Sequence, residues 1–195
     1  MNTAILAIDL VNDIVYEKGK VAACASSVRD REVIPRINRA SEYARKCKWL
    51  ALLCKVGFSR DYQDQPKRSP LFGGLHKHDA LQADTFGTRL HAELPVAPAD
   101  IIFTKPRVSP FYGTPLDAAL RANRVERMLI CGVSTSWAIT SACRNAHDRD
   151  FDVVLLEDAC AATSEKEHST TINLLRRIAL VTSVNELIAA QETDT

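Results

Sequence analysis

Six short runs of Ile, Val and Leu constrain the fold of this chain more than any other feature. They lie at residues 4–8, 49–56, 100–104, 127–131, 152–156 and 179–184, and each is too short for a typical helix. Their apolarity is continuous rather than alternating, as in "AILAI" and "DVVLL", which is typical of strands covered on both faces. Stretches of helical character separate the runs, so we expect an α/β fold with three layers around a largely parallel sheet.

Helix-start signals between the runs support this alternation. Ser164 and Ser183 are each followed three residues later by a glutamate, Glu167 and Glu186, which is the spacing of a capping box. Both pairs therefore predict the first turn of a helix.

Three further segments complete the expected organisation. In "TPLDAALRAN", Thr114 is the expected N-cap and Pro115 the first helical residue. An amphipathic helix is expected over 31–47. Residues 57–98 are rich in Gly, Pro and His with weak periodicity, which predicts a long loop. Loops of that length in compact domains are often functional.

Composition excludes several classes of partner. The chain has 195 residues, a length that indicates one domain over 1–195, and 25 basic against 24 acidic residues give a net charge of +1. We therefore expect no nucleic acid and no membrane as partner. The N-terminal segment lacks the basic region of a signal peptide. Six scattered cysteines form no CxxC pair, so we expect reduced thiols in a cytoplasmic protein.

Polar residues follow three of the predicted strands at the point where each ends. Asp9 follows residues 4–8, Lys105 follows 100–104, and "GVSTS" follows 127–131. Ligands bind beyond the carboxyl ends of the strands in doubly wound sheets, so these residues mark a candidate site. The carboxylate and the ammonium could pair there and tune each other's charge. An ordinary salt bridge at the rim is the alternative interpretation.

The turn after the fourth strand is the second part of this candidate site. Ser134 or Thr135 is placed to cap a helix that begins near Ser136. The backbone N–H groups of Trp137 and Ala138 would then point into the cleft, where developing negative charge binds well. A helix with a simple cap is the alternative interpretation, because nearly every helix has one.

These residues resemble the isochorismatase-like hydrolases, a family that includes isochorismatases, nicotinamidases and other amidohydrolases. The likeness lies in "LAIDLVND", in "KPRVSPFYGTPLDAAL", in "ICGVSTSWAITSACRNAHDRDFDVVLLEDACAA" and in the final strand with "NEL". It implies a doubly wound six-stranded parallel sheet with helices on both sides, a small-molecule substrate, no cofactor, and a homodimer or homotetramer.

Most members of that family use an Asp–Lys–Cys triad. The resemblance places its aspartate on Asp9, its lysine on Lys105 and its nucleophilic cysteine on Ala138, so the usual thiol is absent. It also implies a cis peptide between Val133 and Ser134, which orients the oxyanion donors.

No other side chain is expected to replace the thiol. Cys143 lies more than a helical turn beyond position 138 and is read as buried packing, and Cys131 as lying below the cleft floor. A serine nucleophile is not expected, because no Asp/His pair matches the G-x-S-x-G pattern. Zinc-binding relatives carry a D-x-H pattern after the second strand, whereas "VGFSRDYQDQP" here has no histidine. We therefore predict no metal.

Isochorismatases themselves lack the cysteine, and they cleave a vinyl ether by protonation and attack of water. The resemblance therefore implies that Asp9 acts as acid or base, that Lys105 tunes it and that water is the nucleophile. Asn12 is expected to orient Asp9, and Arg107 is a candidate carboxylate ligand. The expected apolar walls, with core packing as the alternative role, are Trp137, Phe72, Phe111 and Tyr112.

Three functional hypotheses follow. The first is a hydrolase of a small polar metabolite that works through Asp9, Lys105 and water. The second is a cysteine amidohydrolase inactivated by replacement of cysteine at Ala138. The third is a non-catalytic relative that binds a metabolite in the same cleft.

Overall fold

One parallel sheet organises the computed structural model, which describes residues 1–193. Within these residues the strand order is β3-β2-β1-β4-β5-β6, and every pairing is parallel. The strands are β1 (Thr3–Ile8), β2 (Leu50–Val56), β3 (Ile101–Lys105), β4 (Arg127–Val133), β5 (Asp152–Ala161) and β6 (Leu180–Thr182). All six residues of β1 are buried, as expected for a central strand covered on both faces.

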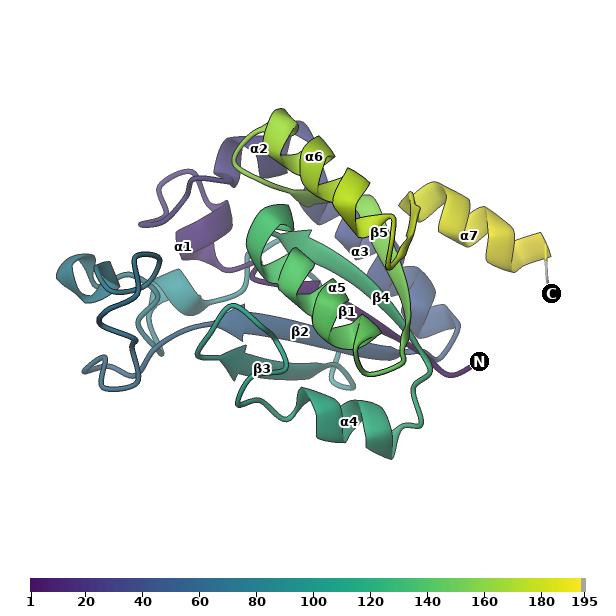
Figure 1. The fold of residues 1–195 in the computed structure, drawn as a ribbon, viewed down its shortest axis with the longest axis horizontal. Coiled ribbons are helices and arrows are strands. Elements are labelled where there is room, and N and C mark those ends of the chain that lie inside the picture. Colours follow the sequence, from purple (N-terminus) through teal and green to yellow (C-terminus); the bar gives the residue numbers. More distant parts are fainter. Residues whose placement is uncertain (194–195) are drawn as a thin grey trace.

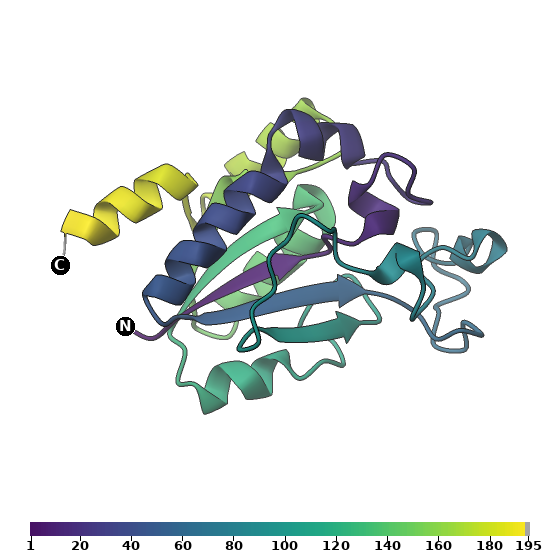
Figure 2. The ribbon, with the colours of Figure 1, turned by 180° about the vertical axis from the view of Figure 1, so that it is seen from behind.

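Helices cover both faces of this sheet, which confirms the three-layer α/β prediction. Helix α3 packs on one face, and α4 and α5 lie on the other (Figures 1 and 2). The helices are α1 (Asn12–Val15), α2 (Ala25–Asp30), α3 (Val33–Lys46), α4 (Leu116–Ala122), α5 (Thr140–His147), α6 (Glu165–Leu175) and α7 (Val184–Thr193). Shorter helical turns are η1 (Leu75–His78), η2 (Phe86–Thr88) and the π-helical turn η3 (Thr135–Ile139).

Helix boundaries differ from the sequence prediction at two starts. The helix expected from residue 31 begins at Val33, because Glu32 adopts a left-handed conformation with φ of 53°. Helix α4 begins at Leu116 with Pro115 as its N-cap, and Thr114 Oγ1 still accepts a hydrogen bond from the Leu116 amide at 3.3 Å.

The capping box at Ser183 is complete, whereas at Ser164 the serine caps the helix but Glu167 bonds to the Thr163 amide instead of that of Ser164. The Ser164 hydroxyl accepts a hydrogen bond from the Glu167 amide at 3.2 Å, and the Ser183 hydroxyl accepts one from the Glu186 amide at the same distance. These two contacts satisfy amides that would otherwise lack a partner in the first turn of α6 and α7.

The segment 57–98 contains no strand and extends past the carboxyl ends of the strands, at the left in Figure 1. A small apolar cluster that includes Phe58, Tyr62 and Leu81 fills its interior. The buried Asp13 carboxylate on α1 accepts a hydrogen bond from the Leu81 amide at 2.7 Å. The long loop is therefore anchored where it faces the ends of β1 and β2. No helix in residues 1–193 has the length and apolarity that crossing a membrane requires.

Candidate active site

Asp9 and Lys105 form a buried ion pair at the carboxyl edge of the sheet. Asp9 directly follows β1 in a left-handed conformation with φ of 59°, which aspartate tolerates better than most residues. Lys105 ends β3, which is separated from β1 by β2. Its Nζ lies 2.8 Å from Asp9 Oδ2, and the two side chains are 1% and 7% exposed. Lys105 Nζ also donates a hydrogen bond to the Arg107 carbonyl at 3.1 Å.

The second carboxylate oxygen of Asp9 is the unusual atom of this pair. Among the described residues, Oδ1 of Asp9 is buried and has no hydrogen-bond partner. Burial raises the pKa of Asp9 above its ordinary value, although the charge and hydrogen bond of Lys105 oppose that rise. Asp9 is therefore poised to hold a proton and to pass it to a molecule beside it.

Asp9 lines a cavity of about 260 Å³ whose other walls are mainly apolar side chains. Its polar lining residues are Asp9, Lys105, Ser134 and Thr163. The apolar ones are Ile14, Val21, Ala23, Cys24, Val56, Leu71, Phe72, Leu75, Leu81, Val108, Val133, Trp137 and Ala138. The only charged side chains in this lining are the mutually paired Asp9 and Lys105, so the wall carries no free charge for an ionic substrate.

Strand β4 reaches this cavity because of a glycine. Gly132 has φ of 115°, and a Cβ built on it would lie 2.2 Å from the Ile8 carbonyl oxygen. Only glycine lets β4 run this close to the end of β1. The next peptide bond, between Val133 and Ser134, is cis, as the family resemblance implies.

The turn η3 then places position 138 on the cavity wall. Ala138 is buried and lines the cavity with its methyl group. The Trp137 amide differs from the sequence prediction: it donates a hydrogen bond to the Ser134 carbonyl at 3.1 Å and is not directed into the cavity. The Trp137 side chain is largely exposed at the cavity mouth.

The helix cap expected in this turn is also different. Neither Ser134 nor Thr135 caps the helix with its side chain, because both hydroxyls bond elsewhere. Thr135 Oγ1 lies 2.9 Å from Nδ1 of the buried His168 on α6. Arg31 in turn lies 2.9 Å from Nε2 of His168. Through this contact between Thr135 and His168, helix α6 supports the turn η3.

Four of the residues predicted to touch substrate lie outside the cavity lining. The Asn12 amide donates to the Phe86 carbonyl at 2.9 Å, so it ties down the long loop instead of orienting Asp9. Arg107 donates to the Asp64 carbonyl at 3.0 Å and stacks on the exposed ring of Tyr112. Phe111 is buried beneath Arg149, with 4.5 Å from the guanidinium carbon to the ring centre. Phe72 does line the cavity.

Several lining residues were not predicted from the sequence. Leu71, Leu75 and Leu81 come from the long loop, and Cys24 precedes α2. The sequence signal for these three residues is that they are leucines in an otherwise polar segment. They belong to no predicted strand or helix. Cys24 carries no such signal.

Three buried cysteines near this edge of the sheet have protonated thiols at neutral pH. Burial raises the pKa of Cys24 to about 11, and it raises those of Cys131 and Cys143 to about 12. Cys131 and Cys143 are fully buried, as predicted. Thiols of such high pKa are poor nucleophiles, because the thiolate is the reactive form. Residues 1–193 contain no group of three or more His, Cys, Asp or Glu side chains placed to hold a metal ion.

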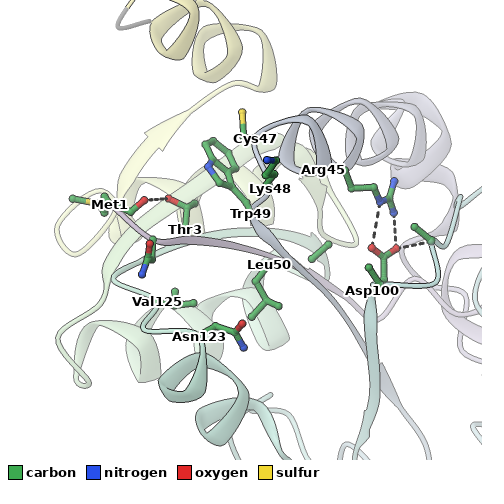
Figure 3. Close-up of a pocket in the computed structure, with 14 residues that line it drawn as sticks. Met1, Thr3, Arg45, Cys47, Lys48, Trp49, Leu50, Asp100, Asn123 and Val125 are labelled. Atoms are coloured by element: carbon green, nitrogen blue, oxygen red, sulfur yellow. Dashed lines mark hydrogen bonds and ion pairs between the residues drawn. The ribbon is translucent and has the colours of Figure 1, made fainter.

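A larger cavity of about 620 Å³ lies near the amino ends of β1 and β2, at the opposite edge of the sheet (Figure 3). Of its charged residues, Arg45 and Asp100 are paired with each other, 2.6 Å apart, and Arg45 also donates to the Pro95 carbonyl, while Lys48 is the other charged side chain of the lining. Unlike Asp9, Asp100 accepts hydrogen bonds with both of its carboxylate oxygens. The chemistry therefore concentrates at the carboxyl edge, as expected for doubly wound sheets.

Comparisons with known proteins agree with this architecture. A family model described as an isochorismatase domain matches residues 3–186. The uncharacterized isochorismatase family protein YecD of Escherichia coli O157:H7 is 31% identical over 192 residues, which cover 96% of this chain and 95% of that relative. The ureidoacrylate amidohydrolase RutB of Cronobacter sakazakii is 27% identical over 172 residues, or 80% of this chain and 73% of the relative.

Solved structures give the same result at the level of the fold. An isochorismatase family protein from Desulfovibrio vulgaris superposes with a TM-score of 0.87 at 24% identity, over 98% of each chain. At that identity the likeness shows the fold alone.

Proposed function

This chain belongs to the isochorismatase family, whose members are hydrolases, and we propose that it cleaves a small uncharged molecule by proton donation from Asp9 and attack of water. No covalent intermediate with the enzyme is required. The sequence led us to expect a polar substrate, but the cavity lining favours one with an apolar body.

The observation that carries this proposal is that Asp9, whose buried Oδ1 has no hydrogen-bond partner, lines an apolar cavity. A buried carboxyl with a raised pKa keeps its proton to a higher pH than an ordinary aspartate, which suits it to act as a general acid. After Asp9 has given up its proton, the Lys105 ammonium 2.8 Å away stabilises the carboxylate that remains. The pair thus stabilises the charge that develops on the protein as the substrate becomes a cation.

Because position 138 carries a methyl group and no thiol, we expect a substrate whose scissile bond breaks without a strong nucleophile. Amide cleavage is difficult because water attacks an amide poorly, and relatives with a thiol solve this with a covalent intermediate. A vinyl ether is different. Protonation of its carbon gives an oxocarbenium ion that water captures as a base takes up the proton of the water, and the resulting hemiacetal collapses to an alcohol and a carbonyl compound. We infer that the substrate carries an enol ether or a similarly acid-labile C–O bond.

A chromogenic vinyl ether tests this proposal. Purified protein is expected to release nitrophenol from para-nitrophenyl vinyl ether faster than buffer does. Asp9→Asn, which keeps the shape of the side chain but holds no acidic proton, is expected to lower kcat at least about 100-fold, the usual contribution of a general acid. Asp117, which is partly exposed and lies outside the cavity lining, gives the control D117N, which is expected to keep the wild-type rate.

The outcomes separate the three hypotheses. A D9N variant as active as wild type refutes the role of Asp9. If wild type is inactive and A138C hydrolyses nicotinamide or ureidoacrylate, the chain is an amidohydrolase without its thiol. Retention of the intact vinyl ether by both wild type and D9N, with no turnover by any variant, indicates a binding protein.

A further inference from the structure

A chain of hydroxyl groups leads from the cavity to a second carboxylate on α6. Ser134 lines the cavity, and its Oγ lies 3.1 Å from Ser136 Oγ. The Ser136 hydroxyl donates a hydrogen bond to Oε1 of Glu167. Oε2 of Glu167 accepts hydrogen bonds from the Thr163 amide at 3.2 Å and from the Thr163 hydroxyl. Two consecutive hydroxyl groups therefore connect the cavity wall to a half-buried carboxylate.

The direction of the hydrogen bonds between Ser134, Ser136 and Glu167 follows from the charge of Glu167. The hydroxyls of Ser136 and Thr163 hold the pKa of Glu167 below its ordinary value, so Glu167 is a carboxylate and only accepts. The proton of Ser136 is thereby committed to Glu167, and Ser136 Oγ has to accept from Ser134. Ser134 Oγ also contacts the Cys24 thiol, and its remaining lone pair can accept a hydrogen bond from a molecule in the cavity.

We propose that Glu167 is the proton acceptor of the hydrolysis and is reached from the cavity through the hydroxyls of Ser134 and Ser136. This inference rests on the function proposed above, because it supplies the base that water attack requires. As a water oxygen bonds to the substrate cation, the water gives a proton to Ser134. Ser134 passes its own proton to Ser136, and Ser136 passes its proton to Glu167. Both serines end neutral, and Glu167 becomes a neutral carboxylic acid.

The two carboxyl groups then have opposite starting states. In the reacting complex Asp9 carries a proton and donates it, whereas Glu167 is ionised and accepts, and their environments shift the two pKa values in opposite directions. Glu167 is half-buried, so solvent can remove the transferred proton after each turnover, and Asp9 regains its proton from water that enters the cavity as the products leave.

Glu186 shows that the capping role alone does not explain the contact with Ser136. Glu186 occupies the same position of a capping box, and its carboxylate contacts Thr182 and Ser183 within its own cap. Glu167 makes the equivalent contacts with Thr163 and additionally reaches Ser136, 31 residues earlier. Glu186 is therefore a matched control for the loss of a capping carboxylate without a connection to the cavity.

The kinetic test compares Glu167→Gln and Ser136→Ala with Glu186→Gln on para-nitrophenyl vinyl ether. Glutamine keeps a hydrogen-bond acceptor for Ser136 but is not basic, so E167Q is expected to lower kcat about 100-fold with KM unchanged. S136A breaks the relay and is expected to do the same. E186Q is expected to keep the wild-type kcat.

The pH profile provides a readout that a structural role would not move. Wild-type kcat should fall as pH drops through the pKa of Glu167, because the acceptor must be ionised, and E167Q should lose that acidic limb. Around Glu167, the Cys24 thiol faces it from the start of α2 and stays neutral at such pH, while Glu165, Lys166 and His168 neighbour it on α6. None of these neighbours is altered in E167Q.

A neutron structure of the wild-type protein at neutral pH tests the relay without any turnover. The expected deuterons lie on Ser136 toward Glu167 and on Ser134 toward Ser136, with a bare Glu167 carboxylate. A deuteron on Glu167, or one on Ser134 directed away from Ser136, overturns the proposal. If D9N abolishes turnover while E167Q and S136A do not, the relay is wrong and the role of Asp9 stands. If wild type cleaves no vinyl ether, the general-acid proposal fails and the neutron result still decides the relay.

Discussion

Replacing Lys105 with Met probes the buried ion pair most directly, because it leaves Asp9 without a partner. The two side chains are 1% and 7% exposed and lie 2.8 Å apart. Removing one member of such a pair typically costs about 3–5 kcal/mol, since the remaining charge is neither paired nor solvated. Asp9 can avoid that state only by binding a proton, so we expect folded K105M to hold a neutral carboxyl at neutral pH.

The size of the effect follows from the proton that Asp9 retains. An aspartate in an unfolded chain has a pKa of about 3.9, so holding it protonated at pH 7 costs roughly three pH units at about 1.4 kcal/mol each, or about 4 kcal/mol. Between pH 5 and pH 7 the folded variant binds one more proton than the unfolded chain. Its free energy of unfolding therefore increases by about 1.4 kcal/mol for each unit by which pH falls.

Urea denaturation followed by circular dichroism at pH 5, 6 and 7 measures this slope. In substrate-free wild type, Lys105 keeps Asp9 ionised, so no such slope arises there. Relative to wild type, K105M should therefore be about 4 kcal/mol less stable at pH 7 and should recover about 2.7 kcal/mol by pH 5. The double variant with Asp9→Asn has no carboxyl to protonate, so that recovery should vanish. A K105M variant with the wild-type pH dependence, or a double variant that keeps the slope, would refute a buried Asp9 carboxyl that depends on Lys105.

Three other predictions concern the turn after β4 and its support. Burial and the Arg31 charge lower the pKa of His168, so the folded state favours neutral His168. The stability that depends on neutral His168 is lost as pH falls below the ordinary histidine pKa. Wild type should therefore lose more stability than H168Q between pH 7 and pH 5 in urea titrations. Gly132→Ala should cost on the order of 3 kcal/mol, because its Cβ meets the Ile8 carbonyl and φ is positive, and a melting temperature equal to that of wild type would contradict the packing described. Ala138→Cys should add one site of rapid alkylation by iodoacetamide in mass spectrometry, since position 138 lines the cavity; no labelling beyond that of wild type would mean that the cavity does not admit small molecules.

The sheet was predictable because burial on both faces leaves a strong local pattern. The apolar run at 100–104 predicted the strand Ile101–Lys105 to within one residue, and Asp9 and Lys105 were identified because each stands at the end of such a run. Parallel strands place those ends at one edge, so the pairing of the two charges follows from topology.

The contacts of the long loop were not predictable, because they depend on residues far apart in the chain. Asn12 lies 74 residues from Phe86, whose carbonyl accepts its amide hydrogen bond, and no local pattern reports that contact. The same holds for Arg107, whose guanidinium binds a loop carbonyl instead of lining the cavity. The Trp137 amide was misassigned because the turn is π-helical rather than a simple capped α-helix.

The division of labour between strands and loop has a consequence for how this protein can change. The acid and the amine are fixed by the ends of β1 and β3, whereas one excursion between β2 and β3 supplies Leu71, Phe72, Leu75 and Leu81 to the cavity. Exchanging that excursion for one of another shape would alter which molecules fit while leaving the proton donor untouched. Selection, or a protein engineer, can therefore revise the choice of substrate in a single contiguous piece of the gene.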